Sequence, residues 1–374
     1  MSRTNGIPRR LRRRSRTTAL VAVSTVALGA TLLAASADAA TPTEGGARTL
    51  AASVVGFAAV SGYGRTSTTG GAGGPTVTVT SYAQLATALA DDTPRIVRVS
   101  GTISGSGADM LDVGSHKTIL GVGSSATISG FGLDVNGWGP AEVAIGGDTC
   151  DPAEKDTFTH VSNVIIQNLS FRNSPDDSVN VQCYSDHVAI NYNTFYPAAD
   201  GSVDIKRGSD LATVAYNRFV GTDKSMLLGH SDNNGAQDRG YLRVTYHHNW
   251  FDGSATRHPR VRFGYAHLFA NYVDVSDYFI GLGVEGRIYA DGNYVRRAKT
   301  ITQDFGNASV TWTSSNFYDP ATITRANDSG KTKDDWLRVD NKVAAPPYSY
   351  SAGSASATPP AAGAGAGGSE SIPG

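Results

Sequence analysis

Three carboxylates followed by three basic groups are the side chains in this sequence best suited to act together chemically. In chain order they are Asp177, Asp200, Asp204, Lys224, Arg257 and Arg262. Carboxylates that fold close together repel one another unless a proton or a cation lies between them. Oxygen-only ligands suit calcium better than zinc or copper, and the loop pattern of an EF-hand is absent. The acids therefore predict a calcium site, for which the adjacent Asp176 is a further candidate ligand.

Both groups of residues also fit a simpler interpretation. The acids can be solvated loop residues, because oxygen-ligand sites have no sharp sequence code. The basic groups can form surface ion pairs, which contribute little to stability. If a cation is bound beside them, three basic groups call for an anionic ligand that bears carboxylates, which arginine binds through two parallel hydrogen bonds.

The elements that must position these residues form an internal repeat. Short alternating segments end in asparagine, often with an aromatic residue two positions later; the asparagines are Asn168, Asn193, Asn217, Asn249, Asn271, Asn293 and Asn316. Their spacings are 25, 24, 32, 22, 22 and 23, and the long one contains the polar insert 232–240. A period of this size with strand-like alternation predicts an all-β parallel solenoid, one coil per repeat.

In such a solenoid, equivalent positions on successive coils lie about 4.8 Å apart. The asparagines are then expected to form a buried hydrogen-bonded ladder, with a stack of Phe171, Phe195, Phe219 and Phe251 beneath it. Counted forward from the ladder, Asp177, Asp200, Lys224 and Arg257 fall at +9, +7, +7 and +8. This register predicts one charged column on four consecutive coils. Asp204 at +11 and Arg262 at +13 form a second set.

The chain begins with an export signal. Residues 1–16 hold seven arginines and no acid, an apolar run covers Ala19–Ala35, and Ala37–Ala39 is an A-x-A cleavage site. We interpret residues 1–39 as a signal peptide of a secreted, extracellular protein; a membrane anchor fits less well, because the run is short and dotted with polar residues. The arginines allow either the general or the twin-arginine route. After cleavage 25 basic and 32 acidic residues remain, a net charge near −7.

The charge and the remaining segments complete the domain organisation. An acidic protein is a poor candidate for nucleic acid, and we expect a monomer that does not bind membranes. Residues 40–345 are expected to form the solenoid, with a short helix after Ser81 capping its open N-terminal edge, and 346–374 an Ala/Gly/Ser/Pro-rich tail, extended or disordered. Cys150 and Cys183 suit one structural disulfide in a secreted protein; two separate buried thiols are the alternative.

Four ordered motifs resemble the pectate lyases of polysaccharide lyase family one. They are DGSVDIKRGSD (Asp200–Asp210), DKSMLLGHSD (Asp223–Asp232), LRVTYHHNWFDG (Leu242–Gly253) and RHPRVRFG (Arg257–Gly264). The resemblance extends from about Val55 to the tail. It implies a right-handed parallel β-helix that cleaves polygalacturonate by calcium-dependent β-elimination, giving unsaturated products.

The resemblance also implies a role for each site residue. Asp177, Asp200 and Asp204 match the family's calcium ligands, Lys224 and Arg262 its substrate-binding residues, and Arg257 its proposed general base. Elimination removes the C5 proton, α to the uronate carboxylate, and expels the C4 oxygen; cations on that carboxylate stabilise the developing enediolate. Guanidinium normally stays protonated, so a water or hydroxide held by Arg257 is an alternative base.

One segment departs from the family pattern. The family's V-W-I-D-H stands here as Val188-Ala189-Ile190-Asn191-Tyr192, and we expect this to alter packing more than catalysis. Two rival functions stay open. A pectin lyase would act on methyl-esterified substrate without calcium, but that branch replaces the acids with basic residues. A non-catalytic, pectin-binding β-solenoid would not need both Lys224 and Arg257.

Overall fold

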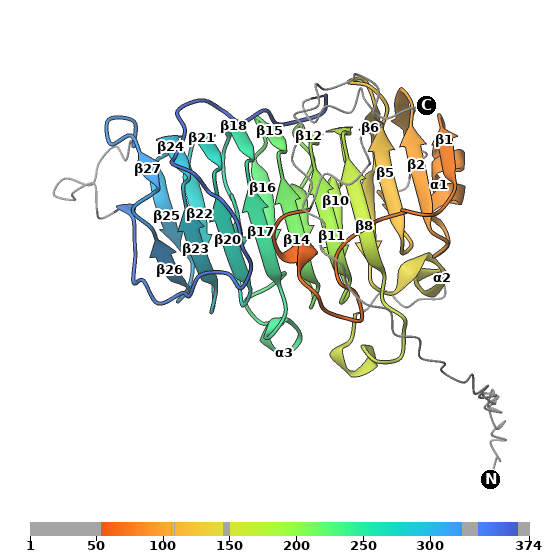
Figure 1. The fold of residues 1–374 in the computed structure, drawn as a ribbon, viewed down its shortest axis with the longest axis horizontal. Helices are drawn as coiled ribbons and strands as arrows, with labels where there is room; N and C mark the ends of the chain where they lie inside the picture. Colours follow the sequence, from red (N-terminus) through yellow and green to blue (C-terminus); the bar gives the residue numbers. More distant parts are fainter. Residues whose placement is uncertain (1–53, 106, 108, 145–149, 324–335, 366–374) are drawn as a thin grey trace, which may run out of the picture. The chain divides into compact units, whose positions relative to one another are not determined.

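In a computed structural model of the chain, the described residues fold into stacked coils of β-strand (Figure 1). The structure describes residues 54–105, 107, 109–144, 150–323 and 336–365, all of them within a compact unit that spans 47–374. Most coils contribute one strand to each of three parallel sheets, and the largest sheet has ten strands. The predicted all-β parallel solenoid is confirmed.

The three sheets differ in length. The ten-stranded sheet runs in the order β1 (Thr76–Val79), β2 (Arg95–Val99), β5 (Lys117–Gly121), β8 (Ser162–Gln167), β11 (Asp186–Asn191), β14 (Asp210–Ala215), β17 (Arg243–His247), β20 (Tyr265–Phe269), β23 (Arg287–Asp291) and β26 (Ser309–Trp312). The eight-stranded sheet contains β4 (Met110–Asp112), β7 (Gly132–Asn136), β10 (Val179–Gln182), β13 (Gly201–Ile205), β16 (Lys224–Leu228), β19 (Arg260–Val261), β22 (Tyr278–Leu282) and β25 (Thr300–Asp304).

The nine-stranded sheet closes each coil. Its strands are β3 (Thr102–Ser104), β6 (Thr127–Ser129), β9 (Ser170–Arg172), β12 (Thr194–Phe195), β15 (Arg218–Val220), β18 (Trp250–Ser254), β21 (Tyr272–Val275), β24 (Tyr294–Arg297) and β27 (Phe317–Tyr318). The helices of the described residues are short: α1 (Tyr82–Leu89), α2 (Gly139–Val143) and α3 (Gly235–Asp238), with 3₁₀ turns η1 (Phe57–Ala59) and η2 (Pro152–Glu154).

A ladder of asparagines joins the coils at one corner, as the repeat predicts. The Nδ2 of each asparagine donates to the Oδ1 of the next at 2.8 to 3.2 Å, through Asn193, Asn217, Asn249, Asn271, Asn293 and Asn316. Asn168 begins the series differently: its Nδ2 donates to the carbonyl of Gly121. Each ladder asparagine from 193 to 293 is buried, so the ladder satisfies polar groups that water cannot reach.

The predicted phenylalanine stack lies on the same coils. Phe171, Phe195, Phe219 and Phe251 are fully buried, with successive ring centroids 5.1 Å apart. The spacing equals about one strand separation, so the rings stack because the coils do. Branched aliphatic side chains of all three sheets fill the rest of the interior.

The predicted capping helix is confirmed as α1. The Oγ of Ser81 accepts a hydrogen bond from the backbone N–H of Gln84, which satisfies one of the free donors of a helix start. Leu85 and Leu89 are fully buried against the first coils, and α1 lies beside β1 and β2 at that end of the solenoid (Figure 1).

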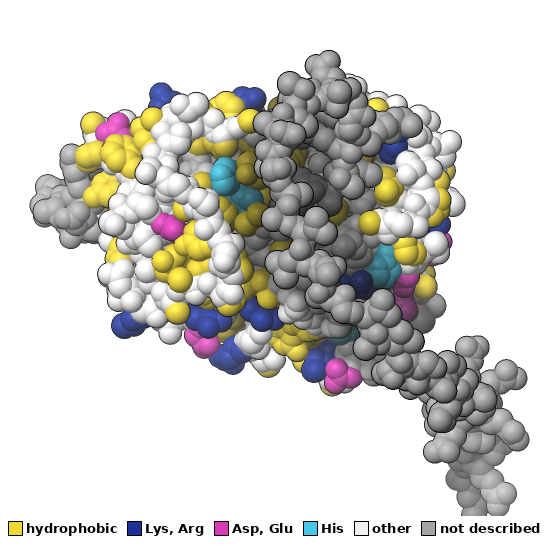
Figure 2. All heavy atoms as spheres, viewed as in Figure 1, with side chains coloured by type: hydrophobic (Ala, Val, Ile, Leu, Met, Phe, Trp, Pro, Cys, Tyr) yellow, Lys and Arg dark blue, Asp and Glu magenta, His cyan; other side chains and the backbone are white. Residues whose placement is uncertain are grey.

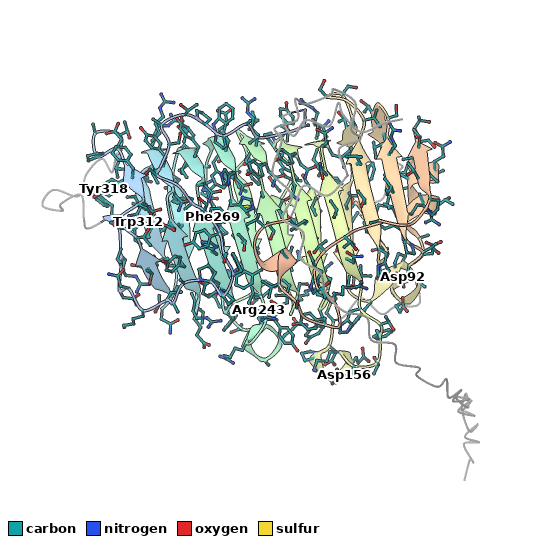
Figure 3. The ribbon with its side chains drawn as sticks, in the orientation of Figure 1. Asp92, Asp156, Arg243, Phe269, Trp312 and Tyr318 are labelled. Carbon is teal, nitrogen blue, oxygen red and sulfur yellow. A yellow bond between two sulfur atoms is a disulfide. The ribbon has the colours of Figure 1, made fainter. Side chains whose placement is uncertain are left out.

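Two chain segments cover the outer face of the ten-stranded sheet. The backbone N–H groups of Phe57 and Ala58 in η1 donate to Thr245 and Thr213 on β17 and β14. From the other end of the chain, Tyr350 packs on Phe269 with ring centroids 5.0 Å apart; Phe269 lies on this sheet (Figure 3). These contacts bury what would otherwise be an exposed sheet face.

The tail is extended and bound to the solenoid as far as residue 365. The described residues 346–365 contain no helix or strand. The N–H of Gly363 donates to the carbonyl of Tyr216, that of Ala364 to Thr194, and that of Gly365 to Asn168. Of the two predicted states, extended is therefore the one observed for these residues.

The disulfide between Cys150 and Cys183 is confirmed, with Cα atoms 5.1 Å apart. It ties the segment before η2 to the end of β10. The predicted signal peptide, residues 1–39, lies outside the described residues and stays a prediction. Among the residues that the structure describes, no helix is long and apolar enough to cross a membrane.

The ladder generates a stability prediction. Asn217→Ala removes the acceptor of the Asn193 N–H and the donor to the Ile190 carbonyl. Each buried group left unpaired costs about 1–3 kcal/mol, so we expect the free energy of unfolding to fall by about 3 kcal/mol, measured by urea denaturation. Asn233→Ala, an exposed asparagine outside the ladder, is the control and should change it by less than about 0.5 kcal/mol.

Candidate active site

The charged residues lie where successive coils enter the eight-stranded sheet. Asp176 and Asp177 precede β10, Asp200 precedes β13, and Lys224 is the first residue of β16. Lys224 pairs with Gly201 on one neighbouring coil and with Thr256, next to Arg257, on the other. The structure thus brings together the four consecutive coils of the predicted column.

Three carboxylates converge at this edge. Asp176, Asp177 and Asp200 each offer an oxygen within 4.8 Å of the others. Asp177 is 2% exposed, and its Oδ1 accepts a hydrogen bond of 2.7 Å from the N–H of Gly201. Burial, followed by the charge of Asp177, raises the pKa of Asp176. An all-oxygen donor set with mutual repulsion fits a hard divalent cation such as calcium.

Asp204 lies beside this cluster, in the middle of β13. Burial first, and then the neighbouring Asp177 carboxylate, raise the pKa of Asp204 to about 7. The space in which Asp177 and Asp204 converge is open because residue 201 is glycine: a Cβ there would lie 2.7 Å from the Oδ1 of Asp177 and 3.0 Å from the Oδ1 of Asp204.

A residue that the sequence analysis did not single out joins these two acids. The Nζ of Lys206 lies 3.4 Å from the Oδ2 of Asp177 and 3.7 Å from the Oδ2 of Asp204. The signal was present, because Lys206 is two residues after Asp204 and side chains two apart share a strand face. The ammonium offsets part of the negative charge and so allows the two buried carboxylates to lie close together.

The basic residues of the column differ in their partners. The Nζ of Lys224 lies 2.5 Å from the Oδ1 of Asp200, in a half-exposed ion pair. Arg257 has a backbone φ of 61°, and among the described residues no carboxylate forms an ion pair with its guanidinium. Its charge nevertheless reaches the acids, because it opposes the rise in the pKa of Asp204. Arg257 therefore keeps its donors for another group.

Arg262 lies apart from Asp204, beyond the end of β19. Its Nε donates to the Oδ1 of Asp232 at 2.5 Å and its Nη1 to the carbonyl of Gly229 at 2.9 Å. The side chain is 9% exposed. The two residues of the second predicted set, Asp204 and Arg262, therefore lie apart. Asp204 joins the acids near the starts of the strands, and Arg262 lies where the strands end.

The departing segment 188–192 lies mainly on β11 of the ten-stranded sheet, not on the sheet that carries the charged residues. Val188 and Ile190 point into the core, and Ala189 packs against Ala58 and Ile165 beneath the N-terminal segment. Tyr192 stacks on Tyr216 with ring centroids 4.7 Å apart. In this chain the changed residues thus serve packing between the sheet and the segments that cover it.

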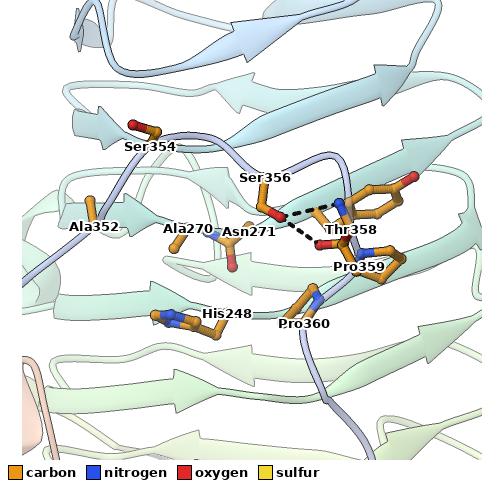
Figure 4. Close-up of a pocket in the computed structure, with 11 residues that line it drawn as sticks. His248, Ala270, Asn271, Ala352, Ser354, Ser356, Thr358, Pro359 and Pro360 are labelled. Carbon is orange, nitrogen blue, oxygen red and sulfur yellow. Dashed lines mark hydrogen bonds between the residues drawn. The ribbon is translucent and has the colours of Figure 1, made fainter.

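A cavity of about 290 Å³ between the tail and the coil corners is unrelated to the charged site (Figure 4). His248 lines this cavity, and burial lowers the pKa of its imidazole. With no carboxylate in its lining, this cavity holds no set of groups comparable to the column.

Comparison with known proteins agrees with the fold. Residues 22–369 match the family model described as pectate lyase. The chain is 33% identical over 281 residues to a protein of Aspergillus fumigatus named "Probable pectate lyase A", which covers 72% of this chain and 75% of that protein. It is 38% identical over 147 residues to Pectate lyase D of Dickeya chrysanthemi, covering 36% and 37% of the two chains.

Solved structures resemble it as well. A pectate lyase from Bacillus sp. N165, determined in complex with trigalacturonate, superposes with a TM-score of 0.63 at 25% identity, covering 81% of this chain and 94% of that one. A thermostable pectate lyase superposes with a TM-score of 0.64 at 24% identity, covering 83% and 96%, a likeness of fold.

The family model, the named relatives and the solved structures identify the chain as an enzyme of the polysaccharide lyase class. The chain belongs to the pectate lyase family. The family assigned from the four motifs is thereby confirmed.

A second buried acid near the site generates a pH prediction. Asp134 on β7 pairs in register with Asn180, which pairs with Asp204. Burial is the largest cause that raises the pKa of Asp134 to about 7, whereas an aspartate in the unfolded chain has a pKa of about 3.9. The folded state therefore binds the extra proton between about pH 4 and pH 7, so this group lowers stability as pH rises through that window.

Asp134→Asn removes that titration. Between pH 5 and pH 8 the free energy of unfolding should fall by on the order of 2 kcal/mol more in the wild type than in the variant. Both are measured by urea denaturation in the presence of a chelator. Asp156→Asn, a carboxylate 87% exposed, should leave the wild-type pH dependence unchanged. Equal pH slopes for wild type and Asp134→Asn would show that Asp134 titrates normally.

Proposed function

We propose that this protein is a secreted, calcium-dependent pectate lyase that cleaves α-1,4-linked polygalacturonate by β-elimination and releases 4,5-unsaturated oligogalacturonates. The observation that carries the proposal is the convergence of Asp176, Asp177 and Asp200 beside Lys224 and Arg257, an arginine with no ion pair to any carboxylate of the described residues. The family membership supports it, and so does the relative solved with trigalacturonate.

The carboxylates suit calcium, with Asp177 and Asp200 at the centre of the donor set, and Asp176 and Asp204 at its borders. When bound, calcium would neutralise charge on a uronate carboxylate and favour loss of the neighbouring proton. Gly201 leaves the room between the carboxylates that a cation requires. The predicted set of Asp177, Asp200 and Asp204 is thus extended by Asp176, and both border residues stay proposals.

The basic residues bind and orient the substrate. Lys224 at the lip of the acid cluster is available to a uronate carboxylate once Asp200 has another partner, because its present ion pair is half exposed and weak. Arg257, whose guanidinium has no acid partner among the described residues, is available to hold the C5 proton's acceptor or to accept it directly. Arg262 is proposed as a second substrate-binding arginine, at the far edge of the same sheet.

The acids favour this function over a pectin lyase, which would dispense with a cation site. A non-catalytic pectin-binding solenoid is less consistent with an arginine left without an acid partner beside the acids. Release of unsaturated uronate, followed by absorbance on polygalacturonate and separately on methyl-esterified pectin, distinguishes all three: a pectate lyase acts on the first, a pectin lyase on the second, and a non-catalytic solenoid on neither.

Calcium dependence is the first test. Activity on polygalacturonate should be lost in excess chelator and restored by added calcium. Asp200→Asn should weaken calcium binding and turnover together while leaving thermal stability near that of the wild type, since Asp200 is half exposed. Calcium affinity is measured by calorimetry. Full activity in chelator would exclude the cation and favour the pectin lyase alternative.

Arg257→Lys is the second test. The variant keeps a positive charge but loses the planar fork and its reach. We expect kcat to fall by roughly 10²–10⁴-fold, the usual contribution of a positioned acid–base group, with KM changed much less. Arg262→Lys is the matched variant and should mainly raise KM. Near-normal kcat with a raised KM for Arg257→Lys would make Arg257 a binding residue only.

A further inference from the structure

A second polar cavity opens at the opposite edge of the eight-stranded sheet, where β13 and β16 end. Its volume is about 420 Å³, within the range of small-ligand sites. Its walls come from four parts of the chain: Arg207 after β13, His230 after β16, and the segments at Cys150 and Gln237. We call it the Arg207 pocket.

Two features of the chain build the pocket. The polar insert 232–240, which makes one repeat longer than the others, contributes α3 with Asn233, Asn234 and Gln237. The disulfide fixes Cys150, whose carbonyl accepts a hydrogen bond from the Nε2 of Gln237. The insert and the disulfide loop are therefore joined across the pocket, and its walls are held in place without a ligand.

The lining of the pocket contains one arginine, Arg207, and one carboxylate, Asp151. The Nη1 of Arg207 contacts the Sγ of Cys150 at 3.7 Å, and among the described residues no carboxylate forms an ion pair with this arginine. Burial first, and then the charges of Arg207, Lys206 and Arg262, lower the pKa of His230. Of these three basic residues Arg207 alone lines the pocket, whereas Lys206 and Arg262 are paired with acids. Lys and Arg side chains lie along the edge from which α3 projects, with Asp and Glu side chains among them (Figures 1 and 2).

The carboxylates nearby already have partners. Asp232 binds Arg262, and the Oδ1 of Asp151 accepts the N–H of Ala153. Asp238, which is fully buried below the insert, accepts the N–H of Gly208. Besides the carboxylate of Asp151, the cavity thus offers a ligand a guanidinium, an imidazole and side-chain amides, a donor set that suits a carboxylate flanked by hydroxyls.

The position of the pocket relates it to the candidate active site. Asp200 precedes β13 and Arg207 follows it, and a five-residue strand spans about 17 Å. A short ligand held between Asp200 and Arg257 does not reach the far edge of the sheet, whereas a longer acidic glycan crossing the sheet does.

We propose that the Arg207 pocket is an accessory subsite that binds a uronate carboxylate of the substrate chain several sugar residues away from the bond that is cleaved. The inference rests on the proposed function, and it makes the polar insert a determinant of preference for long substrates. Arg207 supplies the charge, and His230, Asn233 and Asn234 supply hydrogen bonds to the sugar.

The test compares substrates of two lengths on variants of the pocket. Arg207→Gln should raise KM for octagalacturonate about tenfold and leave its kcat unchanged, while KM for trigalacturonate stays at the wild-type value. His230→Gln, at an exposed position where folding is not at stake, should raise KM for the octamer about threefold. Arg297→Gln removes an exposed arginine from the nine-stranded sheet and is the control; it should change neither constant.

Direct binding separates failure of this inference from failure of the proposed function. Octagalacturonate and an uncharged galactan oligomer of the same length are titrated calorimetrically into wild type and Arg207→Gln. If the protein has no lyase activity and Arg207→Gln lowers its affinity for octagalacturonate but not for the galactan oligomer, the subsite stands and the proposed function fails. An active lyase whose Arg207→Gln and His230→Gln variants bind and cleave both lengths like the wild type would overturn the subsite.

Discussion

The hydrogen bonding of one coil to the next is the interaction on which the rest of this structure depends. Backbone bonds in three parallel sheets hold successive coils one strand spacing apart, and the asparagine ladder from Asn193 to Asn316 repeats that spacing in side chains. Because the spacing is fixed, side chains at equivalent positions of successive coils form a row along the solenoid. The phenylalanine stack and the charged column are two such rows, one facing the core and one facing out.

The charged row places like charges closer together than free carboxylates tolerate. Asp176, Asp177 and Asp200 offer oxygens within 4.8 Å of one another, and Asp204 adds a fourth carboxyl whose pKa burial raises to about 7. The fold accommodates this through Lys206, through the N–H of Gly201 and through the absence of a side chain at residue 201. The stability of the coils outweighs the local repulsion between the carboxylates, and a cation bound there would reduce that repulsion.

The two ends of the described chain serve the ten-stranded sheet, which leaves the eight-stranded sheet for binding. The segment around η1 and the tail with Tyr350 cover the ten-stranded sheet, and the changed motif at 188–192 packs beneath that cover. On the other side, the insert with α3 and the disulfide loop project beside the strand ends of the eight-stranded sheet. Additions to the repeat therefore divide into those that close a face and those that extend a surface for ligands.

The sequence by itself determined the repeat, and with it the solenoid, the asparagine ladder, the phenylalanine stack and the coils that carry Asp177, Asp200, Lys224 and Arg257. A period of two dozen residues leaves little freedom once each coil must stack on the last. It also determined the family, through four long motifs in order.

Only the tertiary structure decided how side chains at the ends of strands pair, because turns do not follow the strand period. It brought Asp176 into the acid cluster and Lys206 between Asp177 and Asp204, gave Arg262 to Asp232 at the opposite edge, and closed the Arg207 pocket from segments more than eighty residues apart, Cys150 and Gln237.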